Sequence, residues 1–258
     1  MKQLSIMLIS ALLIITSACN KHDNTTVTPT VDSTKLYFHL HTNLDTNEVE
    51  AYNEVYEMES GRKISASIAQ LYISGIQLVK EDGSLYSIPG TIIYKVQETE
   101  PYYLGMIPVG NYKSVRFHIG LDDATNALAA TANEALNHSE MWFNAAAQPG
   151  GYVYVNFAGM VDTTTNGDGS EAQMQPFSYK LGTSAAYKEV DMPDHDPAFN
   201  AQKDIIQYVH MSIDYSKLLD GVQLNNNANL SITDAAGNAS VLGIAINNNI
   251  PAMFSYED

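Results

Sequence analysis

The sequence predicts an all-β fold, an antiparallel β-sandwich with a short helix on its rim. Short apolar segments recur along the chain and are separated by turns rich in Gly, Pro and Asn, which is typical of sandwiches. Only residues 124–135 combine several good helix formers, after a pair of aspartates that can cap a helix. At 258 residues the chain can bury one large core, and no repeat of fixed period divides it.

The N-terminus has the pattern of an export signal. Lys2 is followed by an apolar run over residues 4–15 and by small residues that lead to Cys19, the only cysteine. A lone cysteine at this place resembles a bacterial lipobox, in which the cysteine carries the lipid. We therefore expect a signal peptide over residues 1–18, a lipid on Cys19 and a location in the cell envelope, on the periplasmic or outer-membrane surface.

Residues 19–34 are polar, with many Thr, Asn and Asp, and predict a flexible tether. The folded domain is expected over residues 35–258. Its first strand, residues 36–41, alternates strictly. Leu36, Phe38 and Leu40 share one face, and Tyr37, His39 and His41 share the other.

The remaining strands follow from similar apolar runs between turn signals. Residues 103–157 form the expected frame, with a strand, a turn at Pro108-Val109-Gly110-Asn111, a second strand, an Ala-rich excursion and a return to the sheet. The other predicted strands cover residues 64–79, 92–96, 177–181, 187–191, 205–214, 230–233, 240–246 and 252–256. The residues predicted to share one core are Val115, Phe117, Ile119, Val153, Val155, Phe157, Val209, Met211 and Ile213.

The charge balance excludes some functions. Acidic residues outnumber basic ones by 29 to 13, so binding to nucleic acid through phosphate contacts is excluded, whereas cations or basic partners are favoured.

No nucleophile elbow, P-loop, dinucleotide fingerprint or zinc-protease helix motif occurs, and we expect no enzymatic activity. A single cysteine also excludes an internal disulfide and a cysteine-based zinc site.

Histidines are the most specific polar feature. His39 and His41 leave the same strand face about 7 Å apart at Cα, a spacing at which two imidazoles can share one metal ion. The alternative is a solvated outer strand face. His118 and His210 also stand on polar strand faces, where each alone is more often a surface residue. His138 lies four residues before Trp142, the only tryptophan, in the excursion.

Several short motifs, in order over nearly the whole domain, resemble the MbnP-like family of periplasmic copper-binding proteins, first associated with methanobactin gene clusters. The matching pieces are LYISGIQL at 71–78, DG at 82–83, IPVGNY at 107–112, FHIGLD at 117–122, MW at 141–142, GY at 151–152, FAG at 157–159, FSYKLG at 177–182 and NIPAMF at 249–254.

The resemblance implies an exported β-sandwich that binds copper through histidines, here His39, His41 and His118. In some members a tryptophan, oxidised to kynurenine by a partner dihaem peroxidase-like enzyme, joins the site, which makes His138 and Trp142 the candidates for an outer site. Two departures from the family pattern favour the alternative, a cell-envelope module that binds a protein or glycan without metal. Lys180 stands where relatives commonly have a histidine, and a longer insert follows Trp142.

Overall fold

The computed structural model describes residues 32–144 and 151–257, and these belong to one compact unit. The predicted signal peptide, Cys19 and the tether up to residue 31 lie outside the described residues. The first strand, β1 (Ser33–Leu44), begins within the stretch predicted as tether, so the prediction that the tether extends to residue 34 is wrong. The reason is a long-range contact, because Thr34 pairs with Ile107 of β7 and is only 2% exposed despite its polar side chain.

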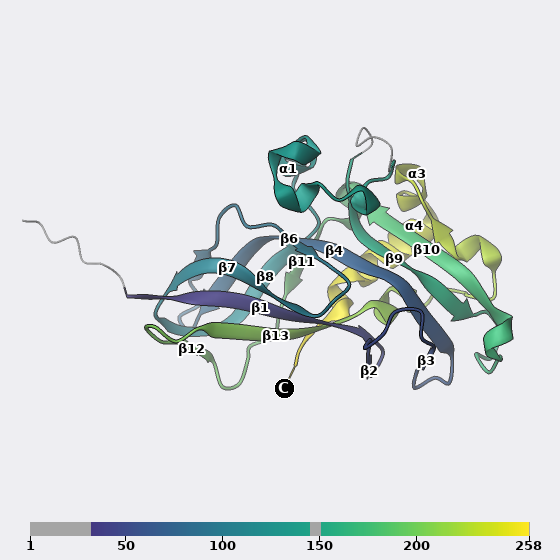
Figure 1. The fold of residues 1–258 in the computed structure, drawn as a ribbon, viewed down its shortest axis with the longest axis horizontal. Coiled ribbons are helices and arrows are strands. Elements are labelled where there is room, and N and C mark those ends of the chain that lie inside the picture. Colours follow the sequence, from purple (N-terminus) through teal and green to yellow (C-terminus); the bar gives the residue numbers. More distant parts are fainter. Residues whose placement is uncertain (1–31, 145–150, 258) are drawn as a thin grey trace, which may run out of the picture. The chain divides into compact units, whose positions relative to one another are not determined.

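In the described part of the chain, the smaller of two sheets has five strands. Strand β1 pairs on one side with β13 (Gln207–Asp214), which in turn pairs with β15 (Phe254–Tyr256). Strands β2 (Asn47–Glu48) and β7 (Glu100–Pro108) also pair with β1. Figure 1 shows β1 and β13 side by side, although more than 160 residues separate them in the chain.

The larger sheet has ten strands within the described residues and contains most of the predicted frame. Its main path runs through β11 (Lys188–Asp191), β8 (Gly110–Ile119), β4 (Lys63–Lys80), β9 (Val153–Asp162), β10 (Met174–Gly182) and β14 (Ser231–Ile232). Strand β12 (Phe199–Ala201) pairs with β8, while β3 (Tyr56–Glu57), β5 (Leu85–Ser87) and β6 (Ile93–Lys95) pair with β4.

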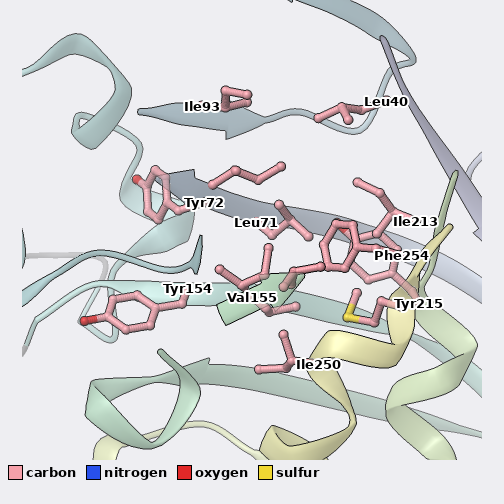
Figure 2. Packing of buried hydrophobic residues seen from close by; sticks show 14 of the residues in the cluster. Leu40, Leu71, Tyr72, Ile93, Tyr154, Val155, Ile213, Tyr215, Ile250 and Phe254 are labelled. Atoms are coloured by element: carbon pink, nitrogen blue, oxygen red, sulfur yellow. The ribbon is translucent and has the colours of Figure 1, made fainter. Parts of the chain in front are cut away.

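The two sheets face each other across one core, which confirms the predicted all-β sandwich (Figure 2). Phe38 of the smaller sheet meets Phe117 of the larger at 6.2 Å between ring centroids, and Phe117 meets Phe254 at 5.1 Å. The predicted core residues all belong to this cluster except Val153, which is fully buried but lies outside it. Most strand pairs are antiparallel as predicted, but β1/β13 and β10/β14 are parallel.

Helical structure differs from the prediction in two places. The expected helix over residues 124–135 is divided into α1 (Asp123–Asn126) and 3₁₀ turns at Ala130–Ala132 and Glu134–Leu136, and a further 3₁₀ turn follows at Ser139–Met141. The predicted strand over residues 240–246 is instead α4 (Val241–Asn249), because the Ser240 side chain caps the Gly243 amide. A Cβ at Gly243 would stand 2.3 Å from the Gly237 carbonyl oxygen, so only glycine allows this close packing.

The remaining helices are short and connect strands. They are α2 (Thr183–Ala186), α3 (Ala235–Asn238) and 3₁₀ turns at Glu171–Gln173, Tyr215–Leu219, Asn227–Asn229 and Ile250–Met253. Among the described residues, every helix is too short or too polar to cross a membrane.

Candidate metal centre

Parallel pairing of β1 with β13 sets the geometry of a histidine cluster on the smaller sheet. In this register His39 stands directly beside His210, and Phe38 stands beside Val209. Because Phe38 and Val209 are buried in the core, their strand neighbours His39 and His210 lie on the outer face. His41 follows two residues after His39 and shares that face.

The three imidazoles converge on one point. His39 Nδ1 lies 3.1 Å from His210 Nδ1 and 3.0 Å from His41 Nε2. The ring of His39 stands nearly perpendicular to both others, at interplanar angles of 84°. One nitrogen of each ring lies within 4.8 Å of the other two, so the three can act on a single ion.

These separations match those of ligands around a metal ion. Two nitrogens that each lie about 2.0 Å from an ion are about 2.8 Å apart at a 90° angle and about 3.3 Å apart at a tetrahedral angle. The observed 3.0 and 3.1 Å fall between these limits. Facing ring nitrogens need a proton or a cation between them, since two lone pairs repel. The donor set therefore fits a metal such as copper or zinc.

Two carboxylates complete the surroundings of His41. Glu48 Oε1, from β2, lies 2.8 Å from His41 Nδ1, and Glu257 Oε2 lies 2.8 Å from His41 Nε2. A contact between Nδ1–H and Glu48 would fix the tautomer that leaves the Nε2 lone pair facing the cluster. The Glu257 amide donates to the His210 carbonyl at 3.2 Å, which brings this carboxylate to the site.

The surroundings of His39 favour its neutral form. Partial burial, followed by the neighbouring rings of His41 and His210, lowers the pKa of His39 below its ordinary value of 6.5, and Glu257 and Glu48 oppose this shift. A lowered pKa means that the imidazole is neutral at neutral pH, which is the form that binds metal. The His41 side chain is 13% exposed, His39 is half-buried and His210 is exposed, so the cluster is accessible from solvent.

The structure does not bring His118 to this cluster. It lies on β8 of the larger sheet, and its neighbour Phe117 points into the core. Phe38, the strand neighbour of His39, meets Phe117, the strand neighbour of His118, between the two sheets. His39 and His118 therefore lie on opposite outer faces of the sandwich. The His118 ring stacks on Tyr187 at 4.7 Å, and its Nε2 lies 3.8 Å from Glu189. The third histidine of the cluster is His210, and not His118 as predicted.

Comparison with known proteins agrees with this architecture. A model of the MbnP family matches residues 33–235. The chain belongs to the MbnP family. The structure is similar to that of MbnP from Methylosinus trichosporium, with a TM-score of 0.56 and 15% identity over 88% of this chain and 99% of that chain. At this identity the similarity shows the fold alone. A comparison with curated proteins found no match.

Trp142, one of the two residues predicted for an outer site, lies apart from the histidine cluster. Trp142 bridges to Tyr152 beside the larger sheet, and its indole Nε1 donates to the Leu136 carbonyl at 3.1 Å. Lys180 Nζ donates to the Trp142 carbonyl at 3.4 Å, so this cation lies beside the tryptophan and away from the three histidines. His138, just before the 3₁₀ turn at Ser139–Met141, stacks on Tyr94 of β6 in the larger sheet with 3.8 Å between ring centroids.

Three members of the site were missed by sequence reasoning, namely His210, Glu48 and Glu257. The alternation around His210 was visible, but a lone histidine on a strand face carries no partner in the sequence. Its partner depends on parallel pairing between strands far apart in the chain, which periodicity does not specify. Glu257 follows the last strand and offers no motif.

Proposed function

We propose that this protein is a non-enzymatic copper-binding lipoprotein of the cell envelope. The observation that carries the proposal is that His39 lies within hydrogen-bond distance of both His41 and His210 on one outer sheet face, with one nitrogen of each ring within 4.8 Å of the other two. The chain belongs to the MbnP family, and its resemblance to the copper-binding proteins of that family supports copper as the metal. Among first-row divalent metals, copper also binds most tightly to nitrogen and oxygen ligands.

Each residue has a distinct role in this proposal. His39 Nδ1, His41 Nε2 and His210 Nδ1 donate to the ion, Glu257 supplies a fourth, anionic donor, and Glu48 orients His41 through Nδ1. A formal net charge of −16 raises the concentration of cations near the surface and favours their capture. Bound copper would supply an ion that can change its oxidation state by one electron.

The location and the partner belong to the same proposal. A lipid on Cys19 would hold the protein at a membrane surface, and the residues before β1 would act as its tether. A dihaem peroxidase-like partner would act on Trp142, which lies on the other sheet from the histidine cluster. In this proposal, oxidation of the tryptophan and binding of copper would therefore be separate events.

The alternative, a metal-free binding module for a glycan or protein, rests on a row of three tyrosines, of which the outer two are exposed and the middle one is half-buried. Tyr37, Tyr103 and Tyr208 stand side by side across β7, β1 and β13, next to the histidines. Glycans stack on the free faces of aromatic rings. Here Tyr37 has both neighbours at 5.2 and 5.4 Å between ring centroids, so its faces are partly occupied. This arrangement favours copper over the glycan.

The test is a copper titration of the purified domain without the signal peptide. The wild-type protein should bind one equivalent of copper through nitrogen ligands, visible in the electron paramagnetic resonance spectrum. The double variant His39→Ala/His41→Ala should lose this spectrum, while mass spectrometry of both proteins follows oxidation of Trp142. Equal, weak copper uptake by the two proteins would refute the proposal and leave the binding module.

A further inference from the structure

An exposed apolar surface lies at the end of the sandwich where the chain enters β1 (Figure 1). Half of the large apolar side chains that are exposed in the described part of the chain gather there. They come from β7, from the residue after it and from the start of β13, and they are Tyr103, Met106, Val109, Ile205, Ile206 and Tyr208. We call these six residues the entry patch. The copper proposal uses none of them.

The entry patch is continuous along the outer face of the smaller sheet. Met106 pairs with Lys35 of β1, and these two side chains line a hollow of about 300 Å³ together with Ile206. The two tyrosines of the patch flank Tyr37, two residues further along β1, at 5.2 and 5.4 Å between ring centroids. Apolar surface therefore extends from the start of β1 to the tyrosine row.

The position of the patch relative to Cys19 indicates what covers it. The Val109 amide donates to the Asp32 carbonyl at 3.0 Å, and the Thr34 hydroxyl donates to the Ile205 carbonyl, so the start of β1 is held against the patch. Asp32 follows Cys19 by 13 residues, and a chain of that length spans at most about 45 Å. If Cys19 carries a lipid, as proposed above, the patch lies within that distance of the bilayer.

The charges around the patch suit a neutral lipid surface. Lys203 Nζ pairs with Asp32 at 2.8 Å, and the hollow contains one cation, Lys35, and one carboxylate, Asp204. The large negative charge of the chain is therefore not concentrated here, and alkyl and aromatic surface dominates. Such side chains enter the boundary between lipid headgroups and acyl chains, where tyrosine is enriched and lysine can reach a phosphate.

We propose that the entry patch rests on the phospholipid bilayer, with Met106 and Ile206 at the acyl boundary and the patch tyrosines among the headgroups. This contact is weak and reversible by itself, so the lipid on Cys19 holds the protein and the patch orients it. His39 follows Lys35 by four residues, which places the histidine cluster about 13 Å further along the strand. The cluster then stays in water while the protein remains at the membrane.

The experiment couples Cys19, the only cysteine, to a maleimide lipid in phosphatidylcholine vesicles, with metal-free protein of residues 19–258. A reporter is introduced by Ile206→Trp in a Trp142→Phe background, and thermal unfolding verifies the fold. Phosphatidylcholine with brominated acyl chains quenches an indole that reaches the acyl boundary. The reporter at the patch should lose about half of its emission or more, and its emission should shift to shorter wavelength.

Ile244→Trp in the same background is the matched control. Ile244 is 50% exposed, close to the 46% of Ile206, but it lies on α4. The end of α4 contacts the 3₁₀ turn that follows β13, whereas Ile206 lies before that strand. Brominated lipid should leave the control unchanged. Met106→Asp should abolish quenching of the patch reporter, because it places a charge in the contact, whereas Val241→Asp on α4 should retain it.

Three results would overturn the proposal. They are no quenching of Ile206→Trp, equal quenching of Ile206→Trp and Ile244→Trp, and quenching that survives Met106→Asp. Dimers that form without vesicles and are dissociated by Met106→Asp, measured by sedimentation, would instead assign the patch to a second copy of the chain. The coupling is chemical and the protein is metal-free, so a failure of lipidation in cells or of copper binding would not change these results.

Discussion

Replacing Glu257 by glutamine isolates the role of the carboxylate at the histidine cluster. The exchange keeps the shape of the side chain but removes the charge that lies 2.8 Å from His41 Nε2. Outer partners that only orient metal ligands typically contribute 10–100-fold in affinity, or about 1.4–2.8 kcal/mol, and a direct anionic donor should contribute no less than the lower limit. The Glu257 side chain is 35% exposed, so solvent screening places the effect near the lower limit, at about tenfold.

Glu48→Gln is the matched comparison, because it changes the carboxylate on the opposite nitrogen of the same ring. The glutamine oxygen still accepts from Nδ1–H, so orientation is retained and we expect a loss of only about threefold. Competition with a chelator of known affinity measures both variants, and unchanged thermal unfolding of the metal-free proteins verifies their folds. If Glu257→Gln binds copper as tightly as the wild type, Glu257 is not a donor and the site consists of imidazoles alone.

Three further predictions follow from the fold, the electrostatics and the N-terminus. Phe117→Ser should lower the free energy of unfolding by about 3–5 kcal/mol, because a fully buried ring with two aromatic neighbours is removed. Denaturant unfolding measures this loss, and a loss below about 1 kcal/mol would contradict a core shared by the two sheets. Copper affinity should fall as the pH is lowered into the range where His39 takes up a proton, which lies below 6.5 because the pKa of His39 is lowered. A loss of copper affinity that begins well above pH 6.5 would contradict the lowered pKa of His39. Cys19→Ala should move the protein from the membrane fraction to the soluble fraction, and an unchanged distribution would exclude the lipid anchor.

Alternation along single strands was enough to predict the sandwich and its core. Phe38, Phe117 and Val155 face inward because each stands in a segment with a period of two, and the structure confirms this. The segment 240–246 was misassigned because a short apolar run does not by itself distinguish a strand from a helix. The segment forms a helix because the Ser240 hydroxyl accepts from the Gly243 amide and because Gly243 packs closely against the Gly237 carbonyl.

The sequence predicted that His39 and His41 share a site, but it did not predict which histidine joins them. His39 and His41 are neighbours within one strand, so their common face follows from the sequence. The third histidine depends on which strand lies next to β1, and this is determined by long-range packing. His118 has a polar strand face and a family motif in its favour, yet it belongs to the other sheet. Only the parallel register of β1 with β13 selects His210.

The most direct test of the copper site therefore compares His210→Ala with His118→Ala. Both variants remove one histidine from an outer strand face, but only His210 contacts His39, at 3.1 Å. Copper titration followed by electron paramagnetic resonance should show that His210→Ala loses one nitrogen ligand and at least tenfold in affinity. His118→Ala should retain the wild-type spectrum and affinity. The reverse result, or equal behaviour of the two variants, would contradict a site built from His39, His41 and His210.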